Sequence, residues 1–454
     1  MERSNGVKKT QLSKFKYAIM GNSAAGISCA ETIRQKDKRS GIAVISDEPH
    51  LAYARCLLPN YIEGSFKKED LPIRSADFYK SSGIDLILGK KVVEISEKNK
   101  NLTLDDKTKI EFDNLLIATG ASPTIPQIQG VDKDGVLGLR TIADAESILK
   151  LLPSVDTVVV LGGGLVGTKA AYYLGKIGKK VKIVVKSPHI LSQMCDARSA
   201  GIMSKEMEKN KIEILTQTDI AEIQGKEKIK SVKLDNGKTI DCQLLIVAKG
   251  VRPNMDFLKD TSVKIDRGIV VDRKMQTNIP AIYAAGDCAQ GYDLLSGKNQ
   301  AHAMWPNAVK QARIAAKNMV GEETLFEGAV GLNSLEYYGV AMVSAGWFRV
   351  EGPEYEELVQ GHSIRSAYKK ILLKDNKIAG FILVGDIHNA GLYLSLLRQK
   401  TDVAAFKGEI LDYSFNYATA MDYLKDEEKS PSAERFRTTK ESLIHEIYYS
   451  RIGG

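Results

Sequence analysis

Short apolar runs that end at a glycine recur along the first two thirds of the chain. The run "KYAIMG" (16–21) precedes a helical pattern, "ISCAETIRQ" (27–35), and "TVVVL" (157–161) precedes three glycines and the helical pattern "TKAAYYLGKIG" (168–178). The next run, "KVKIVV" (180–185), has the composition of a buried strand. A strand, a glycine turn, a helix and a second strand make a parallel βαβ unit. The pattern therefore predicts an α/β fold with parallel sheets.

The pattern changes near residue 323. Before it, three more apolar runs break at a glycine, "DNLLIATGASP" (113–123), "DCQLLIVAKGVRPN" (241–254) and "TNIPAIYAAGD" (277–287), and a helical pattern follows at 306–321. Beyond it, apolar and polar residues alternate in "LNSLEYYGVAMVSAGW" (332–347), "RSAYKKILLKD" (365–375) and "NKIAGFILVGD" (376–386), which is typical of an antiparallel sheet. We expect a hairpin turn at Asp375 and Asn376 and a helix at 390–400.

These patterns predict an α/β chain with two Rossmann-like dinucleotide-binding domains and a C-terminal α+β domain, which the family resemblance described below implies is an interface domain. The first dinucleotide-binding domain is expected to be discontinuous, formed by residues 1–122 and 247–322. Residues 123–246 would form the second, and residues 323–454 the interface domain. Two such domains predict two bound nucleotides.

The glycine turns carry the candidate binding chemistry. Glycines allow a tight turn and close helix packing, and the N–H groups at the start of the helix can hold a pyrophosphate. The first turn, "GNSAAG" (21–26), has Ser23 in place of the middle glycine, whereas "GGGLVG" (162–167) has all three glycines and is more specific. Asp287, at the end of an apolar run, could bind a polyol or cap the next turn, and the residues alone leave both open.

Together these motifs resemble the pyridine nucleotide–disulfide oxidoreductase superfamily of FAD- and NAD(P)H-dependent reductases. The resemblance covers nearly the whole chain, assigns residues 1–122 and 247–322 to FAD and 123–246 to NAD(P)H, and implies a homodimer formed through the third domain. The implied FAD-binding residues are Gly21, Ser23, Ala24, Ala25, Gly26, Asp47, Glu48, Arg55, Ala118, Thr119, Gly120, Gly286 and Asp287. The implied NAD(P)H-binding residues are Gly162, Gly164, Leu165, Val166, Gly167 and Lys186.

One segment, "ISDEPHLAYARCLLPNYI" (45–62), narrows the resemblance. It is similar to rubredoxin, ferredoxin and nitrite reductase flavoproteins, in which the arginine matched by Arg55 approaches the FAD phosphates. A lysine of some of these proteins is replaced by Asn60. "GNSAAG" and "FILVGDIHNAGLYLSLL" (381–397) also resemble flavin oxidoreductases associated with carbon monoxide dehydrogenase.

The same segment resembles a second branch, the coenzyme A-disulfide reductases and NADH oxidases, whose single redox cysteine matches Cys56. A catalytic thiol needs a cation, a helix N-terminus or a cofactor beside it, and free cysteine is more often a small buried hydrophobic residue. "LDYSFNYATAMDYL" (411–424) resembles the interface segment of that branch and places Tyr413, Tyr417 and Asp422 on matching positions. The resemblance implies that Tyr417 of one subunit assists at Cys56 of the other, whereas the alternative is interface packing.

The end of the strand after the second glycine turn indicates which nicotinamide coenzyme binds. NADH enzymes place a carboxylate there for the adenosine ribose, and NADPH enzymes place cations there. Here Val185 takes that position, followed by Lys186, and no carboxylate is nearby in the sequence. This favours NADPH, although Lys186 could be an ordinary solvated lysine. Lys169 stands where many relatives carry a glutamate, and it could stabilise reduced flavin or extend to water.

Composition excludes several other functions. The chain has 454 residues, 43% of them hydrophobic and 26% charged, and no apolar run long enough to span a membrane, so we expect a cytoplasmic protein. Its five cysteines form no C-x-x-C pair, so neither an iron–sulfur cluster nor a structural zinc site is encoded. The net charge of +8 comes from lysines mixed with acids, which favours acidic protein partners over nucleic acid.

We therefore predict an FAD-dependent oxidoreductase that exchanges hydride with NAD(P)H and electrons with a small ferredoxin-like or rubredoxin-like iron–sulfur carrier protein. The alternative is a Cys56-dependent coenzyme A-disulfide reductase or NADH oxidase or peroxidase. Two complete nucleotide pockets make a simple nucleotide sensor a poor third interpretation.

Overall fold

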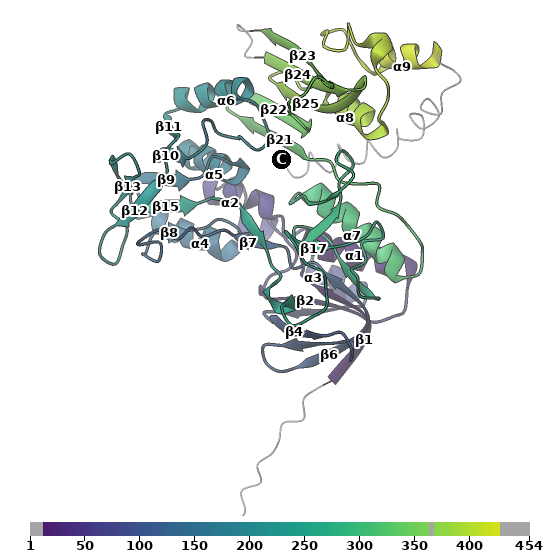
Figure 1. Cartoon of the computed structure of the whole chain (residues 1–454). Helices are drawn as coiled ribbons and strands as arrows, with labels where there is room; N and C mark the ends of the chain where they lie inside the picture. Colours follow the sequence, from purple (N-terminus) through teal and green to yellow (C-terminus); the bar gives the residue numbers. More distant parts are fainter. Residues whose placement is uncertain (1–11, 363–366, 427–454) are drawn as a thin grey trace, which may run out of the picture. The chain divides into compact units, whose positions relative to one another are not determined.

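The computed structural model describes residues 12–362 and 367–426, and its contacts divide the chain into two compact units (Figure 1). Unit 1 contains Met1–Ala54, Leu71–Ser122 and Arg252–Ala329. Unit 2 contains Arg55–Asp70, Pro123–Val251 and Val330–Gly454. Each unit is therefore assembled from segments that are distant in the sequence.

Unit 1 is built on a seven-stranded sheet that contains both parallel and antiparallel pairs. The parallel part has the order β3 (Ile84–Leu88), β2 (Ile42–Ser46), β1 (Leu12–Met20), β6 (Lys109–Ile117), and β18 (Ile282–Ala284) also pairs with β6. β4 (Val92–Ser96) and β5 (Asn101–Leu104) extend it in antiparallel fashion. The registers bring the carboxyl ends of β1, β2, β6 and β18 to one edge, where a parallel sheet binds ligands.

The long helices of unit 1 are α1 (Ala24–Lys36) and α7 (Trp305–Met319), which pack against each other. Their small residues permit this approach, since Ala30, Ala312 and Ala315 are fully buried. The smaller elements are α3 (Ala76–Ser81), the short helix η4 (Asp256–Leu258), and a three-stranded sheet of β17 (Ile269–Val270), β19 (Ala289–Tyr292) and β20 (Asn299–Ala301).

The first part of unit 2 repeats the strand order of unit 1. Its parallel sheet runs β11 (Ile212–Thr216), β10 (Lys180–Val185), β9 (Thr157–Leu161), β15 (Leu244–Val247), β8 (Val136–Leu137). Its helices are α4 (Ile142–Leu151), η3 (Leu152–Ser154), α5 (Leu165–Lys176) and α6 (Ala197–Lys209). An antiparallel sheet of β12 (Ile220–Gln224), β13 (Ser231–Leu234) and β14 (Thr239–Asp241) follows, and β7 (Ala121–Pro123) pairs with β16 (Val251–Pro253) where the chain passes between the units.

A short segment around Cys56 also belongs to unit 2. It forms the helices η1 (Arg55–Leu57), α2 (Leu58–Glu63) and η2 (Lys68–Asp70), and α2 packs against α4 and α5. This placement is unexpected from the sequence, because strands of unit 1 precede and follow the segment.

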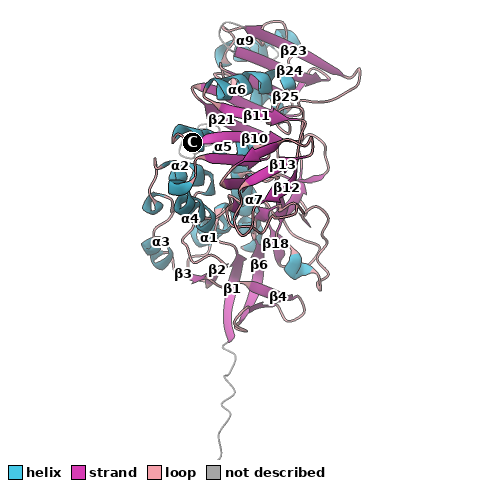
Figure 2. Cartoon of the chain, turned by 90° about the vertical axis from the view of Figure 1, so that its left-hand side faces the viewer, coloured by secondary structure: helices cyan, strands magenta, loops and turns pink. Residues whose placement is uncertain are grey.

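The C-terminal part of unit 2 is an antiparallel sheet, as the alternating pattern predicts (Figure 2). Its order is β21 (Leu332–Tyr337), β22 (Val340–Gly346), β25 (Lys377–Val384), β24 (Ala367–Lys374), β23 (Tyr355–His362), and β23 is the strand that the sequence did not predict. Asp375 and Asn376 form the expected hairpin turn with φ values of 50° and 54°, which suits a two-residue turn. The helices are α8 (Ala390–Gln399), which packs on β25 and β22, η5 (Ala404–Phe406) and α9 (Tyr417–Asp426).

None of the helices in the described residues is both long and apolar enough to cross a membrane. The expectation of a cytoplasmic location stays a prediction.

Candidate functional site

The first glycine turn follows β1 and is held by backbone contacts at the carboxyl edge of the sheet of unit 1. The Gly21 N–H donates to the carbonyl of Ile45 at 2.7 Å, and the Ala118 N–H donates to the carbonyl of Met20 at 2.8 Å. Gly21 has a φ of 115°, and a Cβ there would lie 2.1 Å from the Ala118 carbonyl oxygen. A residue with a side chain therefore cannot replace it without moving the backbone.

The second turn repeats this arrangement in unit 2. The Gly162 N–H donates to the carbonyl of Val184 at 2.9 Å, and the Ala248 N–H donates to the carbonyl of Leu161 at 2.8 Å. Gly162 has a φ of 122°, and a Cβ there would lie 2.2 Å from the Ala248 oxygen. The two turns share one geometry although their sequences differ.

The third glycine of each turn lets the following helix approach the turn. A Cβ on Gly26 would lie 1.8 Å from the Gly21 carbonyl oxygen, and one on Gly167 would lie 2.0 Å from that of Gly162. The middle positions are different, because Ser23 and Gly164 begin α1 and α5 as N-cap residues. A Cβ on Gly164 would meet no atom within 4 Å, and the Ser23 side chain makes no capping hydrogen bond. The open space at Gly164 fits a pyrophosphate group, which is the part of FAD and of NAD(P)H that such turns bind, and Ser23 takes the same position before α1.

A third motif meets the first turn in unit 1. Gly286 lies against the glycine turn and α7, because a Cβ on it would lie 3.3 Å from the Cβ of Ala25 and 3.5 Å from that of Ala308. The Gly286 N–H donates to the Gln311 side-chain oxygen at 2.8 Å, which holds this loop and the adjacent Asp287 against α7. The sequence interpretation missed Gln311, although a polar residue within the alanine-rich face of a helix is a usable signal.

The ends of β2 and β6 bring further predicted residues to the same edge. Asp47 is exposed after β2, and Glu48 accepts a hydrogen bond from the Tyr53 hydroxyl at 2.7 Å. Ala118 is buried at the end of β6, and Thr119 is fixed by Asn254, whose amide donates to the Thr119 carbonyl at 2.9 Å. Gly120 is fixed similarly, since its carbonyl accepts from the backbone N–H of Asn254 at 3.0 Å.

A buried pair that the sequence interpretation missed supports the first turn. The Tyr79 hydroxyl donates to the side-chain oxygen of Asn22 at 2.9 Å, and the Ala52 N–H donates to that hydroxyl at 3.3 Å. Both side chains are almost fully buried. They link the glycine turn to α3 and to the chain that follows β2.

Cys56 and Lys169 meet in unit 2. The Lys169 ammonium donates to the Cys56 carbonyl at 3.3 Å, and both residues are half-buried. Burial raises the pKa of the Cys56 thiol, and the nearby Lys169 charge opposes that shift. Burial lowers the pKa of Lys169, and Cys56 opposes this shift in turn. Arg55 donates to the carbonyl of Arg140 at 3.1 Å, so the predicted phosphate-binding arginine contacts the loop before α4.

The predicted partner-subunit residues lie on the surface of the C-terminal part. Tyr413 and Tyr417 are 51% and 45% exposed, and Asp422 is exposed on α9. The Lys369 ammonium lies 4.5 Å from the centre of the Tyr413 ring. Their exposure is compatible with an interface between subunits, and the assignment of Tyr417 to catalysis stays a prediction.

The loop after β10 is folded back onto the second glycine turn. The Leu191 N–H donates to the Gly163 carbonyl at 2.6 Å, and the Ser192 hydroxyl donates to the Ser187 hydroxyl at 3.1 Å. Lys186 is exposed at the strand end. Its ammonium and these two hydroxyls are groups that can bind a phosphate, and the carboxylate that would accept from a ribose is replaced by Val185.

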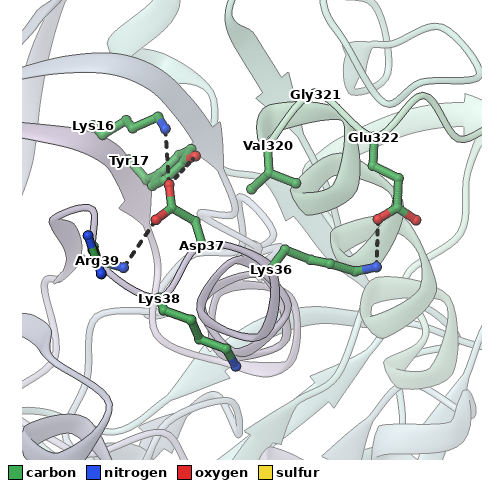
Figure 3. Close-up of a pocket in the computed structure, with 9 residues that line it drawn as sticks. All are labelled: Lys16, Tyr17, Lys36, Asp37, Lys38, Arg39, Val320, Gly321 and Glu322. Carbon is green, nitrogen blue, oxygen red and sulfur yellow. Dashed lines mark hydrogen bonds and ion pairs between the residues drawn. The ribbon is translucent and has the colours of Figure 1, made fainter.

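A separate hollow of about 570 Å³ lies on unit 1 (Figure 3). Asp37 lies beside it and accepts hydrogen bonds from Lys16, Tyr17 and the Arg39 backbone, while Lys36 pairs with Glu322. The hollow adjoins the C-terminal end of α1, whereas the glycine turn adjoins its N-terminal end. It is therefore not the nucleotide site.

Within the part of the chain that the structure describes, histidine, cysteine and acidic side chains form no group able to hold a metal ion.

Two glycine turns, each at the carboxyl edge of its own parallel sheet, define a protein that can bind two dinucleotides. The chain belongs to the pyridine nucleotide-disulphide oxidoreductase family, which it matches over residues 15–312. Residues 332–401 match the rubredoxin NAD+ reductase C-terminal domain. Family membership implies FAD and NAD(P)H as cofactors, and the glycine turns described above fit both.

Known relatives fall into more than one functional branch. The chain is 31% identical over 395 residues to the nitrite reductase [NAD(P)H] of Bacillus subtilis, covering 87% of this chain and 48% of that protein. It thus spans about half the length of that relative. It is 38% identical over 317 residues to the NADH oxidase of Methanocaldococcus jannaschii, covering 68% of this chain and 70% of that protein.

The crystal structure of NADH:rubredoxin oxidoreductase from Clostridium acetobutylicum is similar in fold and sequence. Its TM-score is 0.73 at 26% identity, covering 87% of this chain and 98% of the other.

Proposed function

We propose that this protein transfers electrons from NAD(P)H, through FAD, to a small iron–sulfur carrier protein of the ferredoxin or rubredoxin type. The observation that carries this proposal is the match of residues 332–401 to the rubredoxin NAD+ reductase C-terminal domain, next to two complete dinucleotide turns. FAD, when bound, would accept a hydride from the nicotinamide and release electrons to the acceptor. The glycine turns and the Gly286 loop would bind and orient the two nucleotides, so that proximity supplies much of the catalysis.

The charge of the chain supports a protein acceptor. The net charge of +8 would attract an acidic carrier and increase its association rate at low salt. We therefore expect carrier reduction to slow as ionic strength rises, whereas reduction of a neutral dye should change little.

The test is an anaerobic assay of NAD(P)H-dependent reduction of a ferredoxin and of a rubredoxin. We expect reduction of at least one of them, and Cys56→Ser should retain that activity because the thiol is not on the proposed electron route. Failure to reduce either carrier, with FAD bound and reducible by NAD(P)H, would refute the proposal. Loss of carrier reduction in Cys56→Ser would also refute it.

A second candidate function is Cys56-dependent reduction of a disulfide, peroxide or oxygen. It is favoured by the position of Cys56, which is partly exposed beside Lys169 while Cys29, Cys195, Cys242 and Cys288 are buried. An anaerobic reductive titration distinguishes the two. FAD alone takes up one electron pair per subunit, whereas FAD plus a mixed disulfide between Cys56 and a small thiol takes up two pairs.

We also propose a preference for NADPH over NADH. Val185 is buried at the position of the usual carboxylate, and Lys186, Ser187 and Ser192 offer an ammonium and two hydroxyls there. Lys186→Gln should lower kcat/KM for NADPH by about tenfold and leave NADH nearly unchanged. Lys180→Gln, at the other end of β10, is the matched control. A higher kcat/KM with NADH in the unmodified protein would contradict the preference.

The domain assignments and the subunit arrangement remain proposals of the same kind. We infer FAD binding by residues 1–122 and 247–322, NAD(P)H binding by residues 123–246, and a homodimer through residues 323–454. Light scattering of the purified protein measures the subunit count directly, and a monomer would remove any role for Tyr417 at the Cys56 of a partner.

A further inference from the structure

The Cys56 segment and α5 are joined by polar contacts at matched spacing. Three residues of the segment, separated by four and then three positions, meet three residues of α5 with the same separations. The pairs are Cys56 carbonyl with Lys169 at 3.3 Å, Asn60 amide with Tyr173 hydroxyl at 2.6 Å, and Glu63 carboxylate with Lys176 at 2.7 Å. This spacing is that of one helix face, so the segment follows α5 over two turns.

Lys169 has no acidic partner among the described residues, which contrasts with Lys176 and its ion pair to Glu63. A half-buried ammonium without a counter-charge is unfavourable. The group that accepts its hydrogen bond is a neutral carbonyl, that of Cys56. A thiolate at Cys56 would supply the missing negative charge.

Asn60 gives a second, independent sign that this contact region is incomplete. Only 7% of Asn60 is exposed, and its side-chain oxygen has no donor among the described residues. Its amide nitrogen donates to the Tyr173 hydroxyl at 2.6 Å.

We propose that Lys169 is a positioning residue that controls the Cys56 thiol, with its ammonium stabilising the thiolate. Lys169 is in the second turn of α5, which begins at the Gly164 turn proposed to hold the coenzyme. A side chain of the helix proposed to bind the coenzyme thereby determines how readily the thiol reacts. This inference does not depend on which acceptor the protein reduces.

Other charged groups near the segment are engaged elsewhere. On α4, Asp144 caps its own helix and Glu146 pairs with Lys68, and Lys150 is exposed. On α5, the rings of Tyr172 and Tyr173 meet edge to face, and Lys176 pairs with Glu63. Of the charges packed around the segment, Lys169 is the one that acts on the thiol.

The experiment measures the alkylation rate of native holoprotein by iodoacetamide as a function of pH. Cys56 is the reporter because the four other cysteines are 0% exposed, and Cys56→Ser gives the background. We expect Lys169→Gln to slow alkylation at pH 7 roughly tenfold, with the difference disappearing at high pH, where both proteins carry a thiolate. Lys169→Arg keeps the charge and should stay within about twofold of the unmodified protein.

Lys176→Gln is the matched control, because it removes a contact of the same helix pair without removing the charge at Cys56. Its pH profile should match that of the unmodified protein. An unchanged profile in Lys169→Gln, or an equal loss in Lys169→Gln and Lys176→Gln at every pH, would overturn the proposal in favour of packing alone. If Lys169→Gln does not fold, a Lys169→Arg protein that folds and alkylates roughly tenfold more slowly overturns it as well.

Discussion

Alanine substitutions at two glycines of the NAD(P)H turn should have opposite consequences for stability and for binding. Gly162 has a φ of 122° and leaves only 2.2 Å between a new Cβ and the Ala248 oxygen, whereas Gly164 has a φ of −78° and open space around it. Gly162→Ala should therefore disturb the fold of the turn. Gly164→Ala should leave the fold intact and occupy the space over the helix start.

The expected size follows from these geometries. A left-handed backbone costs a residue with a side chain about 1–2 kcal/mol, and overpacking costs about 1–3 kcal/mol more, so Gly162→Ala should lose about 2–5 kcal/mol. For a unit of this size the Tm should fall by about 5–20 °C. Gly164→Ala should cost about 1 kcal/mol or less, the difference between glycine and alanine at an N-cap.

Thermal unfolding and coenzyme binding together test this reasoning. Scanning calorimetry should show a lower unfolding temperature for Gly162→Ala than for Gly164→Ala. Titration calorimetry should show that Gly164→Ala binds NAD(P)H with a Kd at least about tenfold weaker, while its FAD content is unchanged. Equal losses of stability in the two variants would show that the clash with the Ala248 oxygen does not govern the turn. Normal coenzyme affinity in Gly164→Ala would show that the pyrophosphate does not lie over this helix start.

Two further predictions concern other buried polar contacts. Gln311→Ala leaves the Gly286 N–H without its buried acceptor, so FAD affinity should fall by roughly tenfold, measured by fluorescence as FAD is released. In the C-terminal sheet, burial raises the pKa of Asp386, but hydrogen bonds from Lys369 and His388 outweigh it and hold the pKa at about 2. Because this carboxylate is depressed in the folded state, its stabilisation is present above its unfolded pKa of about 4 and is lost as pH falls toward 2. Asp386→Asn should lower the free energy of unfolding in urea by about 3–5 kcal/mol at pH 7, because the substitution leaves the Lys369 side chain, which is only 5% exposed, without its carboxylate partner. The loss should be smaller at pH 3. An equal loss at both pH values would contradict the ion-pair account.

Local patterns predicted the parallel sheets and both turns because each depends on neighbouring residues. "TVVVL" and "KVKIVV" coincide with β9 and β10, and Gly21 and Gly162, the first glycines after β1 and β9, both have positive φ. The alternating pattern beyond residue 323 likewise gave β21, β22, β24 and β25. β23 was not predicted because "YEELVQGH" is an edge strand with mostly exposed residues, and its sequence therefore lacks an apolar face.

Contacts between distant segments could not be predicted in the same way. The alanine-rich face around Gln311 marks that residue but does not name Gly286 as its partner, and the sequence around Asn22 does not name Tyr79. The same applies to Cys56, whose chemical setting depends on Lys169, more than a hundred residues later. These partners are fixed by how sheets and helices pack, and one sequence does not specify that packing locally.

The membership of Arg55–Asp70 in unit 2 has a practical consequence for dissecting the protein. A fragment cut at the apparent boundaries of the second dinucleotide fold, residues 123–251, would lose α2. Lys169, Tyr173 and Lys176 of α5 would then face water in place of the 55–70 segment. A recombinant fragment intended for measuring coenzyme affinity should instead include residues 55–70, joined to residues 123–251 by a new linker.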